Sequence, residues 1–258
     1  MEEKSKVWNS LLVISLLLIM VTSDCKKESD TKEQLFTADQ PIEDIEGNVY
    51  KTVEIGTQVW MAENLKTTKY ADATPVPLVT SNSDWHALVY TSKAYCWFNN
   101  YIINKDPYGA LYTWAAATDG ALSSNTNPSG VQGACPTGWH LPSDTEWEEL
   151  TTYLGGSEIA GGKMKEAGLT HWGGKRSSPI VNNGATNESG FTGLPAECRG
   201  DDGSFSGDLS YMGFWWSSTG WGEPFTNGYY RNLGWIVATI YKGNYPKTFG
   251  LSVRCVKD

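Results

Sequence analysis

The chain has 258 residues, including 12 tryptophans and 27 glycines, with 19% charged residues and a formal net charge of −9 at pH 7. This acidic balance argues against nucleic acid as a partner, because a phosphate backbone repels such a surface. The composition is that of one loop-rich domain with a sizeable core.

The N-terminal segment has the features of an export signal. Lys4 and Lys6 precede the apolar run Leu11–Val21, which is shorter than the about 20 residues that a spanning helix needs. A short apolar run behind basic residues is typical of a secretory signal. Cys25 follows where a bacterial lipoprotein is cut and acylated, so residues 1–24 are predicted to be a lipoprotein signal peptide and Cys25 its lipidation site.

Thr22 and Asp24 depart from the usual residues before a lipoprotein cysteine, which leaves an ordinary secretory signal as the alternative. Residues 25–41 are polar and predict a flexible tether. Residues 42–258 then form one domain. We expect the protein at the outer membrane or cell surface, held by its lipid, or otherwise periplasmic or secreted.

The domain opens with a predicted β-hairpin. Alternating side chains from Val49 to Ile55 precede Gly56-Thr57, a two-residue turn with glycine first, and Gln58–Leu65 returns. Val59 and Met61 are the expected inward positions of the returning strand.

A loop is predicted over residues 72–93, and a strand over 94–99. Asp106-Pro107 is expected to open a helix over residues 108–118, because proline suits the first turn of a helix.

The clearest helix start lies at Ser143. Its hydroxyl and the carboxylate of Glu146, three residues later, form the pattern of a capping box. Trp147, Leu150 and Leu154 share one helical face. The pattern predicts an amphipathic helix over residues 144–154 that is fixed to the core through Trp147.

A weaker helix is predicted over residues 157–167, and turns and short strands follow. The strands are expected at residues 214–218, 228–233, 236–241 and 250–256. Helices and antiparallel strands without a βαβ repeat indicate an α+β fold.

Several motifs carry a family resemblance over roughly residues 42–258. They are GNVYKTVEIGTQVWMAENLKT (47–67), AYCWFNN (94–100), YGALYTWAAAT (108–118), CPTGWHLPSDTEWEEL (135–150), NESGFTGLPAECRG (187–200), FWWSST (214–219) and GLSVRCVKD (250–258). In this order they resemble the Fibrobacter succinogenes major paralogous domain, a family of secreted and surface lipoproteins. The resemblance implies no established biochemical activity.

A more distant similarity concerns the fold. LPSDTEWEEL and the closing SVRC are similar to segments of formylglycine-generating enzymes, which share a fold superclass with C-type lectins. The resemblance implies two main helices, short antiparallel sheets and many loops. The catalytic cysteines of those enzymes precede the last strand, and residues 229–249 contain no cysteine here. The similarity therefore implies the scaffold without that chemistry.

Four cysteines besides Cys25 allow three disulfide pairings, and the sequence does not choose among them. Lectin-like folds lock their last strand with a disulfide, and this resemblance implies that Cys135 pairs with Cys255. Cys96 and Cys198 would then be left for each other, although the family more often has glycine at position 198. No CxxC spacing indicates a metal site.

No catalytic constellation is recognised in the sequence, so we expect a non-enzyme. Capping and the helix dipole explain the acidic residues 144–149 better than a pair of glycosidase carboxylates. Asp201, Asp202 and Asp208 can in principle bind calcium, but the lectin calcium signatures are absent and a solvated acidic turn is expected. Arg199-Gly200-Asp201 spells an adhesive tripeptide and is interpreted as a chance match.

The aromatic residues of the last third are the better indication of function. Trp215 and Trp216 are adjacent in a strand and must face opposite sides, and one of them is expected in the core. Trp221, Tyr229, Tyr230 and Trp235 lie among glycine and asparagine, as expected of exposed loops, and both ligand contact and simple packing remain open for them. The leading hypothesis is a non-catalytic surface module that binds glycan or an envelope or host surface component. The alternatives are a structural cell-envelope protein and a polysaccharide-acting enzyme.

Overall fold

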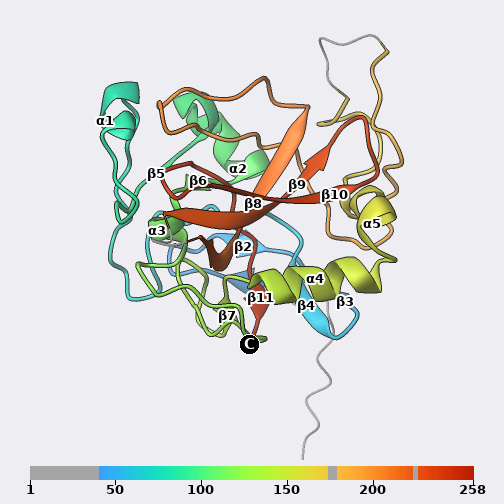
Figure 1. Cartoon of the computed structure of the whole chain (residues 1–258), viewed down its shortest axis with the longest axis horizontal. Coiled ribbons are helices and arrows are strands. Elements are labelled where there is room, and N and C mark those ends of the chain that lie inside the picture. Colours follow the sequence, from blue (N-terminus) through green and yellow to red (C-terminus); the bar gives the residue numbers. More distant parts are fainter. Residues whose placement is uncertain (1–40, 174–178, 223–225) are drawn as a thin grey trace, which may run out of the picture. The chain divides into compact units, whose positions relative to one another are not determined.

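The computed structural model describes residues 41–173, 179–222 and 226–258, which form an α+β domain with small antiparallel sheets (Figure 1). The expected signal peptide 1–24, Cys25 and all but the last residue of the tether lie outside these residues. The strands are β1 (Ile42–Glu43), β2 (Val49–Tyr50), β3 (Thr52–Ile55), β4 (Gln58–Met61), β5 (Tyr95–Cys96), β6 (Leu111–Tyr112), β7 (Trp139–His140), β8 (Met212–Trp221), β9 (Asn227–Gly234), β10 (Ile240–Pro246) and β11 (Val256–Lys257).

The helices are short apart from two. They are α1 (Asn82–His86), α2 (Lys105–Tyr108), α3 (Trp114–Ala117), α4 (Asp144–Tyr153) and α5 (Ser157–Met164), with 3-10 turns η1 (Phe98–Asn100) and η2 (Ile102–Asn104). Among the helices of the described residues, none combines the length and the apolar character needed to cross a bilayer.

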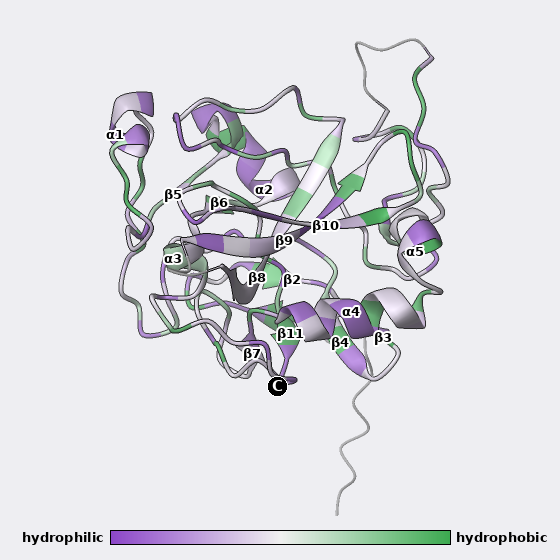
Figure 2. Ribbon diagram, viewed as in Figure 1, coloured by the Kyte–Doolittle hydropathy of each residue, from purple (hydrophilic) through white to green (hydrophobic). Residues whose placement is uncertain are grey.

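The predicted central helix is confirmed as α4. Ser143 Oγ accepts from Glu146 N at 3.2 Å, and Glu146 Oε2 accepts from Ser143 N at 2.8 Å, so the capping box is formed. Trp147 is buried and its ring centroid lies 4.7 Å from that of Trp60. The mixed hydropathy along α4 (Figure 2) fits a helix that rests one face on the core.

The predicted hairpin is also confirmed, as β3 and β4 joined at Gly56-Thr57. The expected single helix over residues 108–118 is wrong. Gly109 has φ +74°, and a Cβ there would lie 2.7 Å from the Leu65 carbonyl oxygen. The next residues form β6, where Tyr112 exchanges backbone hydrogen bonds with Leu251, so distant pairing overrides the local helical pattern.

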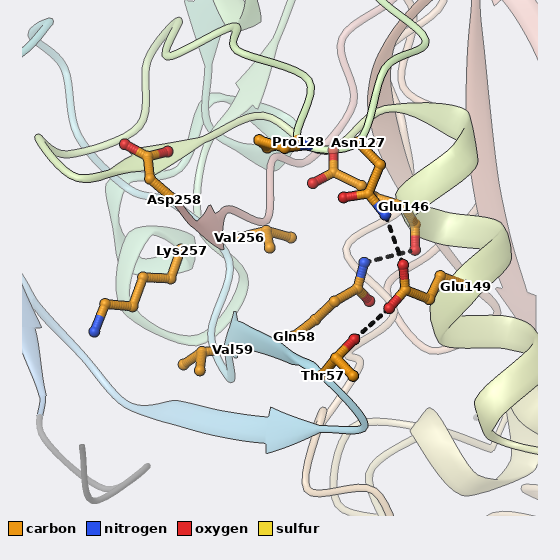
Figure 3. Close-up of a pocket in the computed structure, with 10 residues that line it drawn as sticks. All are labelled: Thr57, Gln58, Val59, Asn127, Pro128, Glu146, Glu149, Val256, Lys257 and Asp258. Carbon is orange, nitrogen blue, oxygen red and sulfur yellow. Dashed lines mark hydrogen bonds between the residues drawn. The ribbon is translucent and has the colours of Figure 1, made fainter. Parts of the chain in front are cut away.

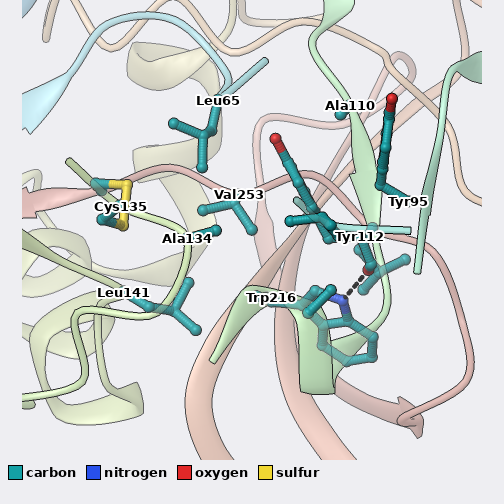
Figure 4. Close-up of a cluster of buried hydrophobic side chains, with 14 of the residues drawn as sticks. Leu65, Tyr95, Ala110, Tyr112, Ala134, Cys135, Leu141, Trp216 and Val253 are labelled. Atoms are coloured by element: carbon teal, nitrogen blue, oxygen red, sulfur yellow. Dashed lines mark hydrogen bonds between the residues drawn. A yellow bond between two sulfur atoms is a disulfide. The ribbon is translucent and has the colours of Figure 1, made fainter. Parts of the chain in front are cut away.

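Sheet β10-β9-β8 lies between two hydrophobic clusters. Trp216 enters the cluster of Tyr112 and Leu251 and donates from Nε1 to the Tyr112 carbonyl at 2.8 Å (Figure 4). Trp215 enters the other cluster, with Trp60 and Trp147. The two tryptophans face opposite sides as predicted, and both are fully buried because both faces of β8 are covered.

The disulfide between Cys135 and Cys255 is present, with Cα atoms 5.9 Å apart (Figure 4). It joins the segment before β7 to the residue directly before the last strand, β11, which pairs with both β4 and β7. The expected second bridge is wrong, because Cys96 and Cys198 are free, buried thiols. Cys96 packs in the small cluster around Trp85, whereas Cys198 belongs to the main core and contacts Ser206 Oγ at 3.0 Å.

Candidate functional site

Two strand registers gather aromatic and amide side chains on one side of sheet β10-β9-β8. Trp221 lies opposite Asn227, and Asn244 lies opposite Tyr229. Residues directly opposite in an antiparallel pair share a face, as do residues two apart along a strand. This face, called here the polar aromatic face, consists of Trp221, Asn227, Tyr229, Lys242 and Asn244.

The polar aromatic face offers flat rings beside hydrogen-bonding groups. Trp221 is 46% exposed, and Tyr229 is partly exposed. Asn227 Nδ2 donates to Asn244 Oδ1 at 2.9 Å, and Lys242 Nζ lies 4.3 Å from the centroid of the Tyr229 ring. The amide pair therefore lies between two aromatic positions.

An ion-pair cluster at the start of α4 fixes one end of this face. Asp144 Oδ1 accepts from Arg231 Nη1 at 2.5 Å, and Asp144 Oδ2 accepts from Lys242 Nζ at 2.5 Å. Arg231 is buried, so its charge needs this partner. Asp144 thus holds Lys242 beside Tyr229 and orders the face.

The other two predicted aromatic residues lie elsewhere. Tyr230 points to the opposite side of the sheet, where its ring stacks on Tyr245 with centroids 4.4 Å apart. Trp235 meets the ring of Tyr211 edge-on at 5.6 Å, beyond the end of β9. The structure therefore brings together Trp221 and Tyr229 and separates them from Tyr230 and Trp235.

Sequence reasoning missed Asn227, Lys242 and Asn244. The signal that would have found them is the strand pairing itself, since Asn244 becomes a neighbour of Asn227 only through the register of β9 and β10. The sequence also predicted a strand at residues 236–241, whereas β10 runs from Ile240 to Pro246. The strand predicted at residues 250–256 is wrong except at its end, because β11 begins at Val256.

A separate polar pocket of about 490 Å³ lies where α4 meets the β3–β4 turn and the last residues of the chain (Figure 3). Glu149 accepts hydrogen bonds from Thr57 Oγ1 and, at 2.6 Å, from Asn127 Nδ2. Gln58 Nε2 donates to the Glu146 carbonyl at 3.2 Å. These bonds tie the pocket walls to each other.

His140 links this pocket to β11. Its Nε2 lies 2.7 Å from Glu146 Oε1, and its Nδ1 lies 2.7 Å from Asp258 Oδ1. Burial alone would lower the pKa of His140, but the two carboxylates outweigh it and raise the pKa above its ordinary 6.5. The resulting stabilisation is complete below pH 6.5 and is lost as pH rises through the raised pKa.

The oxygens of Glu146 serve the fold. Oε2 accepts from Ser143 N and, at 3.2 Å, from Ser129 N, while Oε1 contacts His140. This arrangement agrees with the interpretation of the acidic residues 144–149 as capping and structural groups.

Comparison with known protein families shows to which family the chain belongs. The profile of the Fibrobacter succinogenes major domain family matches residues 53–257. The chain belongs to this family. No curated protein and no solved structure matches the chain. The family name states no activity, so function has to be argued from the chemistry of the described residues.

In the acidic turn of this Fibrobacter succinogenes major domain, the carboxylate of Asp202 is bonded within the turn. Asp202 Oδ1 accepts from Ser204 N and Oγ at 2.9 and 2.7 Å. Across residues 41–173, 179–222 and 226–258, no three His, Cys, Asp or Glu side chains are grouped to hold a metal ion. Arg199 of the Arg-Gly-Asp tripeptide is fully buried, which agrees with a chance match.

One pH effect in this major domain comes from Glu197, which is 2% exposed. Burial raises the pKa of Glu197 from 4.5 to about 7, although its Oε1 accepts from Met212 N at 2.8 Å. A raised pKa gives stability that is complete below pH 4.5 and is lost as pH rises through about 7. We expect Glu197→Gln to remove this loss, so that the variant gains about 2–3 kcal/mol relative to wild type between these limits.

Urea denaturation at pH 4.5, 6 and 8 measures this difference. Glu158→Gln, at an exposed position, is the matched control and should follow wild type throughout. A difference between Glu197→Gln and wild type that stays constant with pH would contradict the assignment.

Proposed function

We propose that this protein is an exported, lipid-anchored bacterial surface protein whose domain binds glycans through the polar aromatic face. The observation that carries the proposal is the placement of Trp221 and Tyr229 on one side of the sheet, with the bonded amides of Asn227 and Asn244 between them. Flat rings suit the apolar faces of sugar rings, and amides suit their hydroxyl groups.

The geometry favours binding without large rearrangement. The hydrogen bond between the two amides uses Asn227 Nδ2 and Asn244 Oδ1. Among the described residues, Asn227 Oδ1 and Asn244 Nδ2 have no other hydrogen-bond partner, so they can bind the hydroxyl groups of a sugar. Asp144 restrains Lys242. A face ordered before the ligand arrives loses less conformational entropy on binding.

A lectin-like form of the α+β fold is part of the proposal. It is supported by α4 and α5 as the two longest helices of the described residues, by small antiparallel sheets, and by a disulfide next to the last strand. Surface attachment rests on residues 1–25, where a signal pattern ends at Cys25. Fatty-acid labelling that is lost in Cys25→Ser tests the anchor.

Binding is tested with the 42–258 domain and an array of plant and host glycans. We expect Trp221→Ala and Tyr229→Ala each to weaken binding of a glycan hit by about five- to thirtyfold, because each removes a stacking surface worth about 1–2 kcal/mol. Titration calorimetry measures the affinity.

Trp235→Ala is the control. Because Trp235 lies outside the polar aromatic face, its replacement should leave the glycan affinity unchanged. Equal loss in all three variants, or no glycan bound by a folded wild type, would contradict the proposal. The second outcome would favour a structural or protein-binding role in the envelope.

A further inference from the structure

A second, smaller pocket of about 330 Å³ lies between α3, the segment 120–123 and the residue that follows β10. Its lining includes Tyr90, Trp114, Ala115, Leu122 and Lys247. Tyr90 and Leu122 are exposed, and Trp114 and Ala115 are buried. The walls of the pocket are thus largely apolar, and Lys247 is the charged residue that lines it.

Lys247 is a largely buried lysine whose ammonium group lies against an aromatic ring. It is 6% exposed, and its Nζ lies 3.6 Å from the centroid of the Trp114 ring. Within residues 41–173, 179–222 and 226–258, no hydrogen bond or ion pair of this Nζ is recorded. Burial lowers the pKa of Lys247 to about 8, because partial desolvation disfavours the charged form of the ammonium group.

Lys165, the other deeply buried lysine, shows how this fold satisfies such a group. Its Nζ donates to the carbonyls of Asn183, Gly234 and Val237 at 2.8, 2.9 and 2.7 Å. Lys247 instead lines a pocket. A cation held against an aromatic ring, with no acceptor for its N–H groups in the described part of the chain, is suited to an anionic ligand.

The position of Lys247 is fixed by its neighbours. The Lys247 carbonyl accepts from Trp114 N at 3.0 Å, and Lys247 N donates to the Thr226 carbonyl at 2.9 Å. The Trp114 ring is held by a bond from Nε1 to the Ser217 carbonyl at 2.9 Å. Ring and ammonium group are therefore arranged before a ligand arrives.

The pocket is distinct from the polar aromatic face. A Cβ on Gly228 would lie 2.5 Å from Trp114 Cδ1 and 3.2 Å from Trp216 Cζ3, so Trp114 lies on the Trp216 side of the sheet. The polar aromatic face is on the other side.

We propose that this pocket binds a carboxylate carried on a single ring, with the Lys247 ammonium group as the anchor and the apolar walls around the ring. The volume is at the lower end of ligand pockets, about 300–1,000 Å³, and suits one ring. The source of the carboxylate is either an acidic sugar or an aromatic acid, and the inference does not depend on glycan binding at the other face.

The test titrates the folded 42–258 domain at pH 7 with D-glucuronate and with benzoate, and with D-glucose and benzyl alcohol as uncharged counterparts. Tryptophan fluorescence and calorimetry report binding. We expect at least one carboxylate to bind about tenfold or more tightly than its counterpart, because a charge-assisted bond to Lys247 is lost in the neutral molecule. Whether glucuronate or benzoate binds better identifies the source.

Lys247→Met should weaken that binding by about tenfold or more, whereas Lys51→Met, at an exposed position, should leave it unchanged. In wild type, binding should weaken as pH rises through about 8, where Lys247 loses its proton. Unchanged binding in a folded Lys247→Met variant, or no binding of either carboxylate at tens of millimolar, would overturn the proposal.

A measurement on the wild-type sequence covers the case in which Lys247→Met does not fold. Uniform ¹³C labelling leaves the lysine ammonium groups unchanged and gives each lysine a Cε–Hε NMR signal that follows its protonation. Of the signals that titrate near pH 8, that of Lys247 should move when the carboxylate is added and that of Lys165 should not. If neither signal moves, the proposal fails.

Discussion

Reduction of the Cys135–Cys255 disulfide is expected to lower the free energy of unfolding by about 4–5 kcal/mol, because the bond closes a loop across a sequence separation of 120 residues. The structural reason adds to the entropic one. β11 contains only Val256 and Lys257, yet it pairs with β4 and β7. Such a short strand depends on the covalent bond at Cys255 to stay between its neighbours.

Urea denaturation with and without reductant measures this effect, and a Cys135→Ser/Cys255→Ser double variant should unfold at the same urea concentration as reduced wild type. Reductant should not change the double variant, since Cys96 and Cys198 are already free. A midpoint that is the same for oxidised and reduced wild type would refute the expected contribution.

Replacement of Arg199 by methionine is expected to cost about 3–5 kcal/mol, because it removes the whole hydrogen-bond network of a fully buried guanidinium group. The Arg199 guanidinium donates to the carbonyls of Gly203, Val79 and Thr80 at 2.9, 2.7 and 2.9 Å. It also donates to Asn82 Oδ1 at 3.1 Å. One side chain therefore holds the loop before α1 against the chain after Cys198.

Two aromatic rings complete the surroundings of Arg199. The guanidinium carbon lies 4.3 Å from the centroid of Trp85 and 4.8 Å from that of Phe205. Arg199→Lys keeps the charge but not the planar fork, so it should recover only part of the loss. Lys69→Met, at an exposed position, should be close to neutral.

Chemical denaturation measures how much Arg199→Met lowers the free energy of unfolding. Amide hydrogen exchange shows which part of the chain is destabilised. Exchange should accelerate first in residues 79–88, which hold α1 and its flanks. Loss of stability in Arg199→Met without faster exchange there would show that the guanidinium acts elsewhere.

Local patterns predicted those parts of the fold whose determinants are close in sequence. The capping box at Ser143 and the turn at Gly56-Thr57 each depend on groups a few residues apart, and both are formed. Residues 108–118 failed as a helix because Tyr112 pairs with Leu251, a partner that no local pattern reveals.

The candidate sites follow the same rule. The sequence predicted Trp221 and Tyr229 as site residues. The other residues of the polar aromatic face become their neighbours only through the pairing register of β8, β9 and β10. Lys247 and Trp114 are far apart in the chain, and only the fold places the ammonium group over the ring. The free state of Cys96 and Cys198 was missed because four cysteines fix no pairing without geometry.

The place of β11 bears on how the protein is made. The hairpin of β3 and β4 is among the first parts of the domain to be synthesised, but its neighbour in the sheet, at Val256, is among the last. Whether the chain emerges from the ribosome or from the export channel, this sheet therefore stays unfinished until the end of the domain has emerged. Fragments that stop before β11 should lack a stable core, and the finished domain should fold as one cooperative unit.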